Sequence, residues 1–154
     1  MAKELLSNIF LFKGLPNDEI HSLSLLTKTE AFHSHQVIFS QGDKADALYI
    51  VKYGSVEIRH SSPHGEDILV STLGTGSHFG EMGFIDGKKR SGTAMAMEDC
   101  EILRLEYAKM NHAFEKAPVM AAHFFKVMAH FLAGRLENTT RDLTFARERK
   151  LKAA

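Results

Sequence analysis

The glycine spacing between residues 29 and 105 constrains the fold more than any other feature of the chain. Short β-rich runs such as ALYIVKY, VEIRH and DILVSTL are separated there by glycines, and no segment of helical period lies between them. Parallel strands need crossover connections of about a dozen residues or more, which are usually helices. The pattern therefore predicts an antiparallel β-domain, a barrel or jelly roll, over residues 28–105.

Helical patterns flank this region on both sides. Residues 1–27 are expected to form N-terminal helices that break at LPND, where Pro16 ends one segment and Asn17 or Asp18 caps the next. Residues 106–154 are expected to form two C-terminal helices, and Pro118 opens the second, which continues unbroken to about residue 150. With 154 residues, the chain has the size of one domain.

The predicted helix 118–150 is too long to pack entirely on so small a β-domain, because it would span about 50 Å. Its aromatic and methionine residues between positions 124 and 131 are expected to pack on that domain. Beyond them the spacing alternates between four and three residues, which forms a heptad-like seam. Past Leu132 this seam has no predicted partner in the chain. We therefore expect a homodimer through this helix. The seam consists of Leu132, Leu136, Thr139, Leu143 and Ala146.

Charge and cysteine content exclude several classes of protein. The 19 basic and 19 acidic residues cancel, so no global field draws the chain to nucleic acid or to an anionic membrane. The sequence has no apolar run long enough to span a bilayer and no signal-peptide cleavage site, which predicts a soluble, cytoplasmic protein. The single cysteine, Cys100, is expected to be a small buried residue.

The stretch FGEMGFIDGKKRSGTAMA, residues 79–96, has the composition of a ligand-binding loop. Its glycines allow close backbone approach, and EMGFI is long enough for one helical turn with free N–H groups. Arg90 can offer a planar fork to phosphate oxygens, and Ser91 adds a hydroxyl. Glu81 would repel a plain anion and therefore indicates a donor such as a sugar hydroxyl. Spacing alone leaves two alternatives, a ribose phosphate site or a solvated turn with a surface ion pair.

Gly80-Glu81-Met82-Gly83 followed by Arg90-Ser91 resembles the phosphate-binding cassette of the cyclic nucleotide-binding domain family. A second motif, GDKADALYIVKYGSVEI, resembles the upstream strand-turn-strand signature of that family. The resemblance covers nearly the whole chain and implies an eight-stranded β-roll with flanking helices. It also implies a non-enzymatic sensor without a cofactor or a metal, whose ligand is cAMP as the first choice and cGMP as the second.

The resemblance also implies a role for each matching residue, and three positions depart from the family pattern. Phe39 and Phe84 are bulkier than usual, and Gly92 stands where the family most often has alanine. Arg135, on the long helix, falls near the position that contacts the base, and the alternative for it is a solvated helix face. The implied contacts are Gly80 and Met82 amides to ribose or phosphate, Glu81 to the ribose 2′-hydroxyl, Arg90 and Ser91 to the cyclic phosphate, and Ile58 and Val70 to the base.

Transcription factors of this family continue into a helix-turn-helix domain that has no counterpart in these residues. We therefore expect no direct DNA binding and a signal that passes through the C-terminal helix to an unidentified protein partner. One alternative is a degenerate β-roll dimer that serves as an interaction module without a ligand.

Another alternative is a cupin-like metal enzyme, suggested by the sequence HSH at residues 33–35. It lacks its ligand set, because Phe39 stands where a glutamate is needed. His60 and His64 are interpreted as part of a solvated hairpin.

Overall fold

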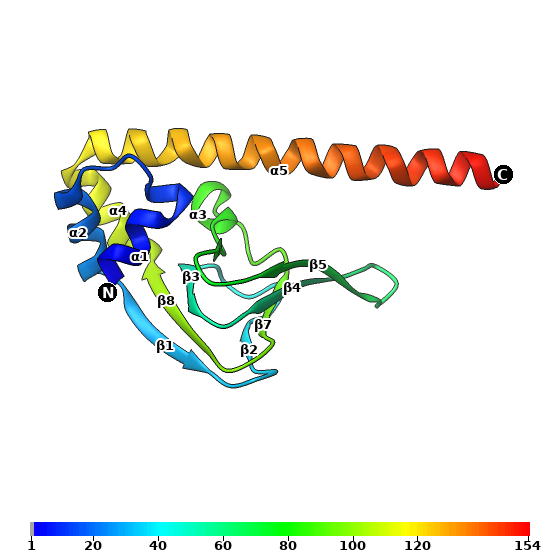
Figure 1. Ribbon diagram of the computed structural model, residues 1–154, viewed down its shortest axis with the longest axis horizontal. Helices are drawn as coiled ribbons and strands as arrows, with labels where there is room; N and C mark the ends of the chain where they lie inside the picture. Colours follow the sequence, from blue (N-terminus) through cyan, green and yellow to red (C-terminus); the bar gives the residue numbers. More distant parts are fainter. Residues whose placement is uncertain (1) are drawn as a thin grey trace.

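The computed structural model describes residues 2–154, and in them eight β-strands form two antiparallel sheets (Figure 1). The first sheet has the order β1-β8-β3-β6, and the second has the order β2-β7-β4-β5. This arrangement confirms the predicted eight-stranded antiparallel β-roll. The strands are β1 (Lys28–Phe32), β2 (Val37–Phe39), β3 (Ala47–Tyr53), β4 (Val56–Ser61), β5 (Asp67–Leu73), β6 (His78–Phe79), β7 (Thr93–Ala96) and β8 (Cys100–Glu106).

Two of these strands, β1 and β6, do not stand out as β-rich runs in the sequence. Strand β1 begins with three polar residues, and it is held by a five-residue antiparallel pairing with β8. Strand β6 has only two residues, which pair with Tyr49 and Ile50 of β3. Both strands therefore depend on their neighbours in the sheet more than on a hydrophobic pattern of their own.

Strands β3 and β8 are buried on both faces and connect two hydrophobic cores. Successive side chains of a strand point to opposite faces. Val51 and Ile102 lie in the core between the two sheets, whereas Leu48 and Leu103 lie in a second core that the helices cover. Burial on both faces explains why ALYIVKY and CEILRLE are almost continuously apolar. Cys100 is buried, as predicted, in the core between the sheets.

The helices α1 (Ala2–Asn8), α2 (Asn17–Leu25) and α4 (Tyr107–Lys116), with the short 3-10 turn η1 (Phe10–Phe12), gather at one end of the β-roll (Figure 1). The expectation that Asn17 or Asp18 caps α2 is wrong. Pro16 is the N-cap residue, no side chain caps this end, and Asn17 is the first helical residue. Pro16 fits there because the first amides of a helix have no intrahelical acceptor, so a residue without N–H loses nothing.

Helix α5 (Pro118–Ala153) runs across the β-roll and extends well past it (Figure 1). Pro118 opens this helix, as predicted, and the helix ends three residues later than expected. Its 36 residues correspond to about 54 Å. Phe124 and Met128, in the first half of this helix, are buried, whereas Leu136 is 68% exposed. Among the helices of residues 2–154, none is both long and apolar enough to cross a membrane.

Gly54, in the turn between β3 and β4, provides a test of this packing. Its φ is +91°, and an added Cβ would lie 2.7 Å from the Sγ atom of Cys100 and 2.9 Å from the backbone oxygen of Asp99. Gly65 has a similar φ of +82° with open space around it. We expect Gly54→Ala to lower the free energy of unfolding by about 3 kcal/mol and Gly65→Ala by about 1 kcal/mol. Urea unfolding measures both values, and equal losses would contradict the close packing at Gly54.

Candidate ligand-binding site

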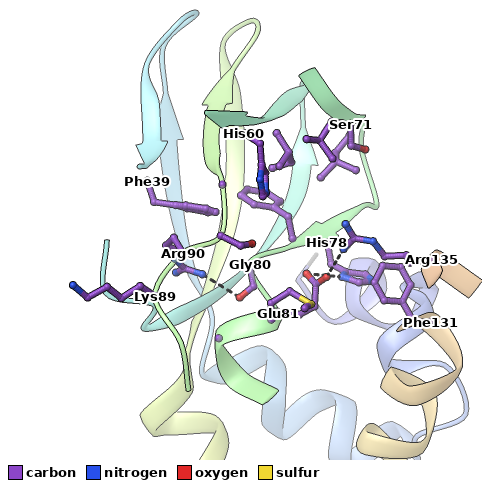
Figure 2. Close-up of a pocket in the computed structure, with 18 residues that line it drawn as sticks. Phe39, His60, Ser71, His78, Gly80, Glu81, Lys89, Arg90, Phe131 and Arg135 are labelled. Carbon is purple, nitrogen blue, oxygen red and sulfur yellow. Dashed lines mark hydrogen bonds and ion pairs between the residues drawn. The ribbon is translucent and has the colours of Figure 1, made fainter. Parts of the chain in front are cut away.

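The residues predicted to bind a ligand surround one cavity of about 290 Å³ (Figure 2). The cavity lies between the loop that follows β6, strands β4 and β5, and the middle of α5. Because these segments are far apart in the chain, only the fold brings their side chains together. All eight predicted residues line the cavity: Ile58, Val70, Gly80, Glu81, Met82, Arg90, Ser91 and Arg135. Their roles in binding stay predictions.

The guanidinium of Arg90 is buried at the inner wall of the cavity, and its side chain is only 4% exposed. Its Nη1 donates to the backbone oxygen of Gly80 at 3.1 Å, and its Nη2 donates to that of Ala47 at 2.9 Å. The plane of the group lies over the ring of Phe39, with 4.2 Å between Cζ and the ring centroid. Its Nε–H is buried and has no hydrogen-bond partner in the described chain. Asp46 lies 3.5 Å away, but its side chain is half exposed.

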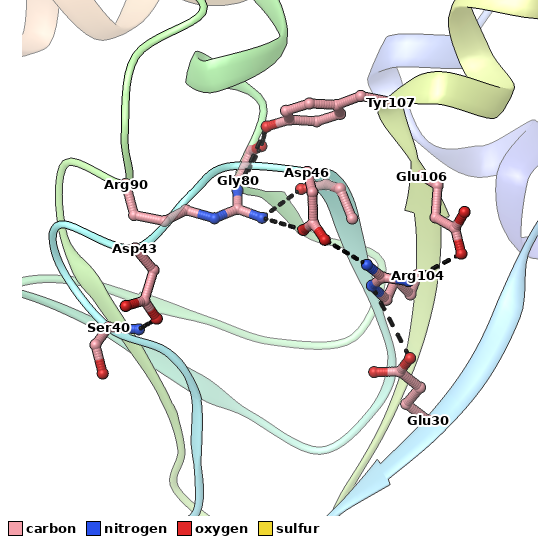
Figure 3. A network of polar contacts seen from close by, with 10 residues as sticks. Glu30, Ser40, Asp43, Asp46, Gly80, Arg90, Arg104, Glu106 and Tyr107 are labelled. Carbon is pink, nitrogen blue, oxygen red and sulfur yellow. Dashed lines mark hydrogen bonds and ion pairs between the residues drawn. The ribbon is translucent and has the colours of Figure 1, made fainter.

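The backbone of Arg90 is held by the first of the two sequence motifs. The amide of Arg90 donates to the Asp43 oxygen at 2.8 Å, and the carbonyl of Arg90 accepts from the Gly42 amide at 2.9 Å. Asp46, three residues further, also bridges Arg90 to Arg104 on β8 (Figure 3). The Gly-Asp motif and the cassette therefore form one structural unit, which gives a physical reason for their occurrence together.

Tyr107, the first residue of α4, connects this unit to the helices. Its hydroxyl donates to the Gly80 oxygen and accepts from Nη1 of Arg90 (Figure 3). Burial raises the pKa of Tyr107 to about 12, so the hydroxyl keeps its proton at physiological pH. A neutral tyrosine can donate and accept at once, which both contacts require.

Glu81 is also buried, with its side chain 3% exposed, although it lies beside a cavity. Its Oε1 accepts from Nη1 of Arg135 on α5 at 2.9 Å, and its Oε2 lies 3.7 Å from Nδ1 of His78 (Figure 2). Burial alone raises the pKa of this carboxyl. The His78 ring, the backbone amide of Glu81 and the Arg135 guanidinium outweigh burial, and the pKa of Glu81 is lowered from its usual 4.5. Glu81 is therefore ionised at neutral pH and keeps acceptor capacity on Oε2.

Helix α5 contacts the cassette at two places. Near the cavity, Phe131 packs on the ring of His78 at 4.4 Å between centroids, and the Arg135 guanidinium lies over Phe131. Six residues before Phe131, Phe125 of α5 stacks on Phe84 of α3 (Met82–Asp86), with an interplanar angle of 6°. The unusual bulk of Phe84 thus has a structural explanation, because its ring joins the aromatic cluster under α5.

Several cavity residues were not predicted as site residues. The sequence indicates only an unusual size for Phe39, predicts that Phe131 packs on the β-domain, and favours a solvated hairpin for His60. Strand β4 instead directs the His60 side chain into the cavity (Figure 2). Period-two alternation from Ile58 would have indicated His60. The additional residues are Phe39, His60, Ser71, Leu73, His78, Phe79, Gly83, Lys89, Gly92 and Phe131.

The histidines do not form a metal centre in the described residues. Within residues 2–154, no group of three or more His, Cys, Asp or Glu side chains lies close enough to hold a metal ion. His33 lies 3.6 Å from Asp99, and the His35 ring contacts the hydroxyl of Ser34. Neither residue lines the cavity.

Comparison with known proteins identifies related sequences and folds. A model of the cyclic nucleotide-binding domain matches residues 29–117. A cyclic AMP receptor protein of Thermus thermophilus is 32% identical over 133 residues, which cover 86% of this chain and 60% of that protein. A cAMP-dependent protein kinase type II regulatory subunit of Drosophila melanogaster is 30% identical over 96 residues, which cover 62% of this chain and 25% of that subunit. The chain therefore spans less than two thirds of the length of either relative.

A solved structure has the same fold as this chain. The crystal structure of the Thermus thermophilus catabolite activator protein superposes with a TM-score of 0.75 at 32% identity. The superposition covers 88% of this chain and 62% of that one. The two-sheet β-roll and the long helix α5 are therefore shared with a solved relative.

The lowered pKa of Glu81 predicts how stability depends on pH without a ligand. A carboxyl whose pKa is lower in the folded state stabilises the fold above its unfolded pKa, and this stabilisation is lost as the pH falls through the folded pKa. We expect Glu81→Gln to reduce the free energy of unfolding by about 1 kcal/mol at pH 7, and the difference from wild type to shrink below about pH 4.5. Urea unfolding of both proteins from pH 7 to pH 3.5 measures this difference in the free energy of unfolding.

Glu66→Gln, in the exposed turn between β4 and β5, is the matched control for removal of a carboxylate. A Glu81→Gln difference that stayed constant over this pH range would contradict the lowered pKa of Glu81.

Proposed function

Since the chain belongs to the cyclic nucleotide-binding domain family, we propose that its cavity binds a cyclic nucleotide, cAMP first and cGMP second. The chain would act as a non-enzymatic, cytoplasmic sensor or regulatory module. The observation that carries this proposal is the buried Nε–H of Arg90, which has no partner in the described chain. A buried cationic donor without an acceptor is costly, and a phosphate oxygen would supply the acceptor.

The sugar of such a ligand finds a suitable acceptor in Glu81. Oε1 of Glu81 already accepts from Arg135, whereas Oε2 lies 3.7 Å from Nδ1 of the His78 ring, beyond hydrogen-bond distance. A ribose 2′-hydroxyl is a donor that can bond to this free oxygen. Arg90 and Glu81 line one small cavity. They therefore suit a ligand in which an anion and a hydroxyl lie a few ångströms apart.

The ion pair between Glu81 and Arg135 provides a route from the ligand to α5. Arg135 is half exposed and reaches the cavity from the helix, so its main anchor in the site is the Glu81 carboxylate. A ribose hydroxyl bound to Glu81 would share this carboxylate with Arg135 and so change how firmly α5 is held. We infer that the signal leaves the site through α5, toward a second copy of the chain and a protein partner.

The projecting half of α5 supports a dimer. Leu136 is 68% exposed and Leu143 is 49% exposed, and both belong to the predicted seam. Exposed leucines at heptad spacing are typical of helices that pair with another helix. Neither side chain is buried within residues 2–154, and the C-terminal part of α5 extends past the β-roll (Figure 1).

Nucleotide binding is tested by thermal unfolding of the full chain with and without 1 mM cAMP or cGMP. A ligand at about 100 times its Kd stabilises the fold by about 2.7 kcal/mol, which is visible as an upward shift in Tm. AMP is the control, because it shares the base and ribose but not the cyclic phosphate. The absence of a shift with either cyclic nucleotide would refute ligand binding and favour the interaction module without a ligand.

Arg90→Lys tests the proposed contact between Arg90 and the phosphate. The lysine ammonium keeps the positive charge but lacks the planar guanidinium. That group bonds to two backbone carbonyls through Nη1 and Nη2 and leaves Nε–H for a ligand. We expect at least a tenfold rise in Kd, measured by calorimetry. Lys88→Arg is the matched control, at an exposed position of the same loop that does not line the cavity. Equal affinity of Arg90→Lys and wild type would show that Arg90 does not bind the phosphate.

The dimer is tested by light scattering of the full chain. We expect a mass near twice the 17.2 kDa of one chain. The double variant Leu136→Glu, Leu143→Glu should give a mass near that of one chain, because buried charges would face each other across the seam. Val119→Glu, at an exposed position outside the seam, should leave the dimer intact. A wild-type mass near 17 kDa with and without nucleotide would contradict the dimer.

A further inference from the structure

Strand β4 places an imidazole in a wall of the cavity that is otherwise mostly apolar. Ile58, Val70 and Leu73 line this wall, together with the hydroxyl of Ser71. His60 lies on the same side of the cavity as Ser71 and across from Glu81 (Figure 2). The His60 side chain is partly buried, and its ring makes no hydrogen bond to any residue between 2 and 154. Its donor and acceptor are therefore both available to a ligand.

The position of the His60 ring depends on Gly92. An added Cβ at position 92 would lie 3.0 Å from Cδ2 and 3.3 Å from Nε2 of His60, and 2.8 Å from the backbone oxygen of Arg59. Any side chain at position 92 would therefore push on the ring and on the strand behind it. Glycine at this position, where the family most often has alanine, leaves the space that the imidazole occupies.

The other end of the cavity already provides partners for phosphate and sugar. Arg90 offers its unpartnered Nε–H, and Glu81 offers a free carboxylate oxygen. If these two groups bind the phosphate and the sugar, the base must lie elsewhere in the cavity. The wall that contains His60 lies across the cavity from Glu81 (Figure 2). We propose that His60 hydrogen-bonds the edge of the base and determines which base is accepted. This inference rests on the proposed cyclic nucleotide binding.

Hydrogen bonding by an imidazole distinguishes bases in a way that an apolar wall does not. A neutral imidazole has one donor and one acceptor at fixed positions, whereas adenine and guanine present different patterns of donors and acceptors on their edges. The hydroxyl of Ser71 rotates to suit either pattern. Discrimination between the two purines should therefore depend on His60 more than on Ser71.

The test is calorimetry of the full chain with cAMP and cGMP at one pH, for wild type, His60→Leu and His64→Leu. His64 lies in the exposed turn after β4, outside the cavity, and controls for loss of a surface imidazole. We expect His60→Leu to change the ratio of the two Kd values by about tenfold and His64→Leu to leave it unchanged. His60→Gln, which keeps a donor and an acceptor at a different spacing, should also change the ratio, and it serves if His60→Leu does not fold.

The outcomes separate this inference from the proposed function. If wild type binds a cyclic nucleotide and the ratio changes less than threefold in the folded His60 variants, His60 does not determine the base, and cyclic nucleotide binding stands. If wild type binds neither nucleotide, both proposals are wrong.

Discussion

The burial of a guanidinium without a full set of acceptors is the constraint on which the rest of this structure depends. Arg90 stays in the interior because Gly80 and Ala47 carbonyls, the Tyr107 hydroxyl and the Phe39 ring hold it there. Each of these groups comes from a different part of the chain. The two motifs, the start of α4 and the short strand β2 must therefore be in place together before the site exists. The one donor left unpaired points to a ligand as the last member of this set.

Glu81 has the complementary position, because it is a buried anion whose ion-pair partner, Arg135, comes from helix α5. Arg135 reaches it from a half-exposed position on α5. The net effect of the surroundings is to keep the carboxylate charged, as its lowered pKa shows. A ligand that approaches Glu81 therefore meets a charged acceptor that α5 already uses. Any ligand that bonds to Glu81 would therefore also affect the contact between Glu81 and Arg135 of α5.

Much of this arrangement could be predicted from the sequence. The rest could not be predicted, and there is a physical reason in each case. Glycine and charge spacing indicated the loop of Glu81 and Arg90, and an unbroken helical pattern indicated α5. Strand β6 is too short to show a period of its own. The contact between Glu81 and Arg135 joins residues 54 positions apart, so no local pattern reveals it. Resemblance placed Arg135 near the base, whereas the structure adds its ion pair with Glu81.

The two ends of the cavity differ in how much freedom their residues have. At the phosphate end, Arg90 shares its contacts with backbone carbonyls and with Tyr107, so a change there disturbs the fold as well as the site. At the other end, His60 makes no hydrogen bond within the described chain, and its place requires only that position 92 has no side chain. We therefore expect a substitution at position 60 to preserve the fold while it changes the proposed contact with the base. On the proposed binding mode, base preference can vary among chains that share this cassette. The proposed phosphate and sugar contacts involve residues that also hold the fold, whereas the proposed base contact does not.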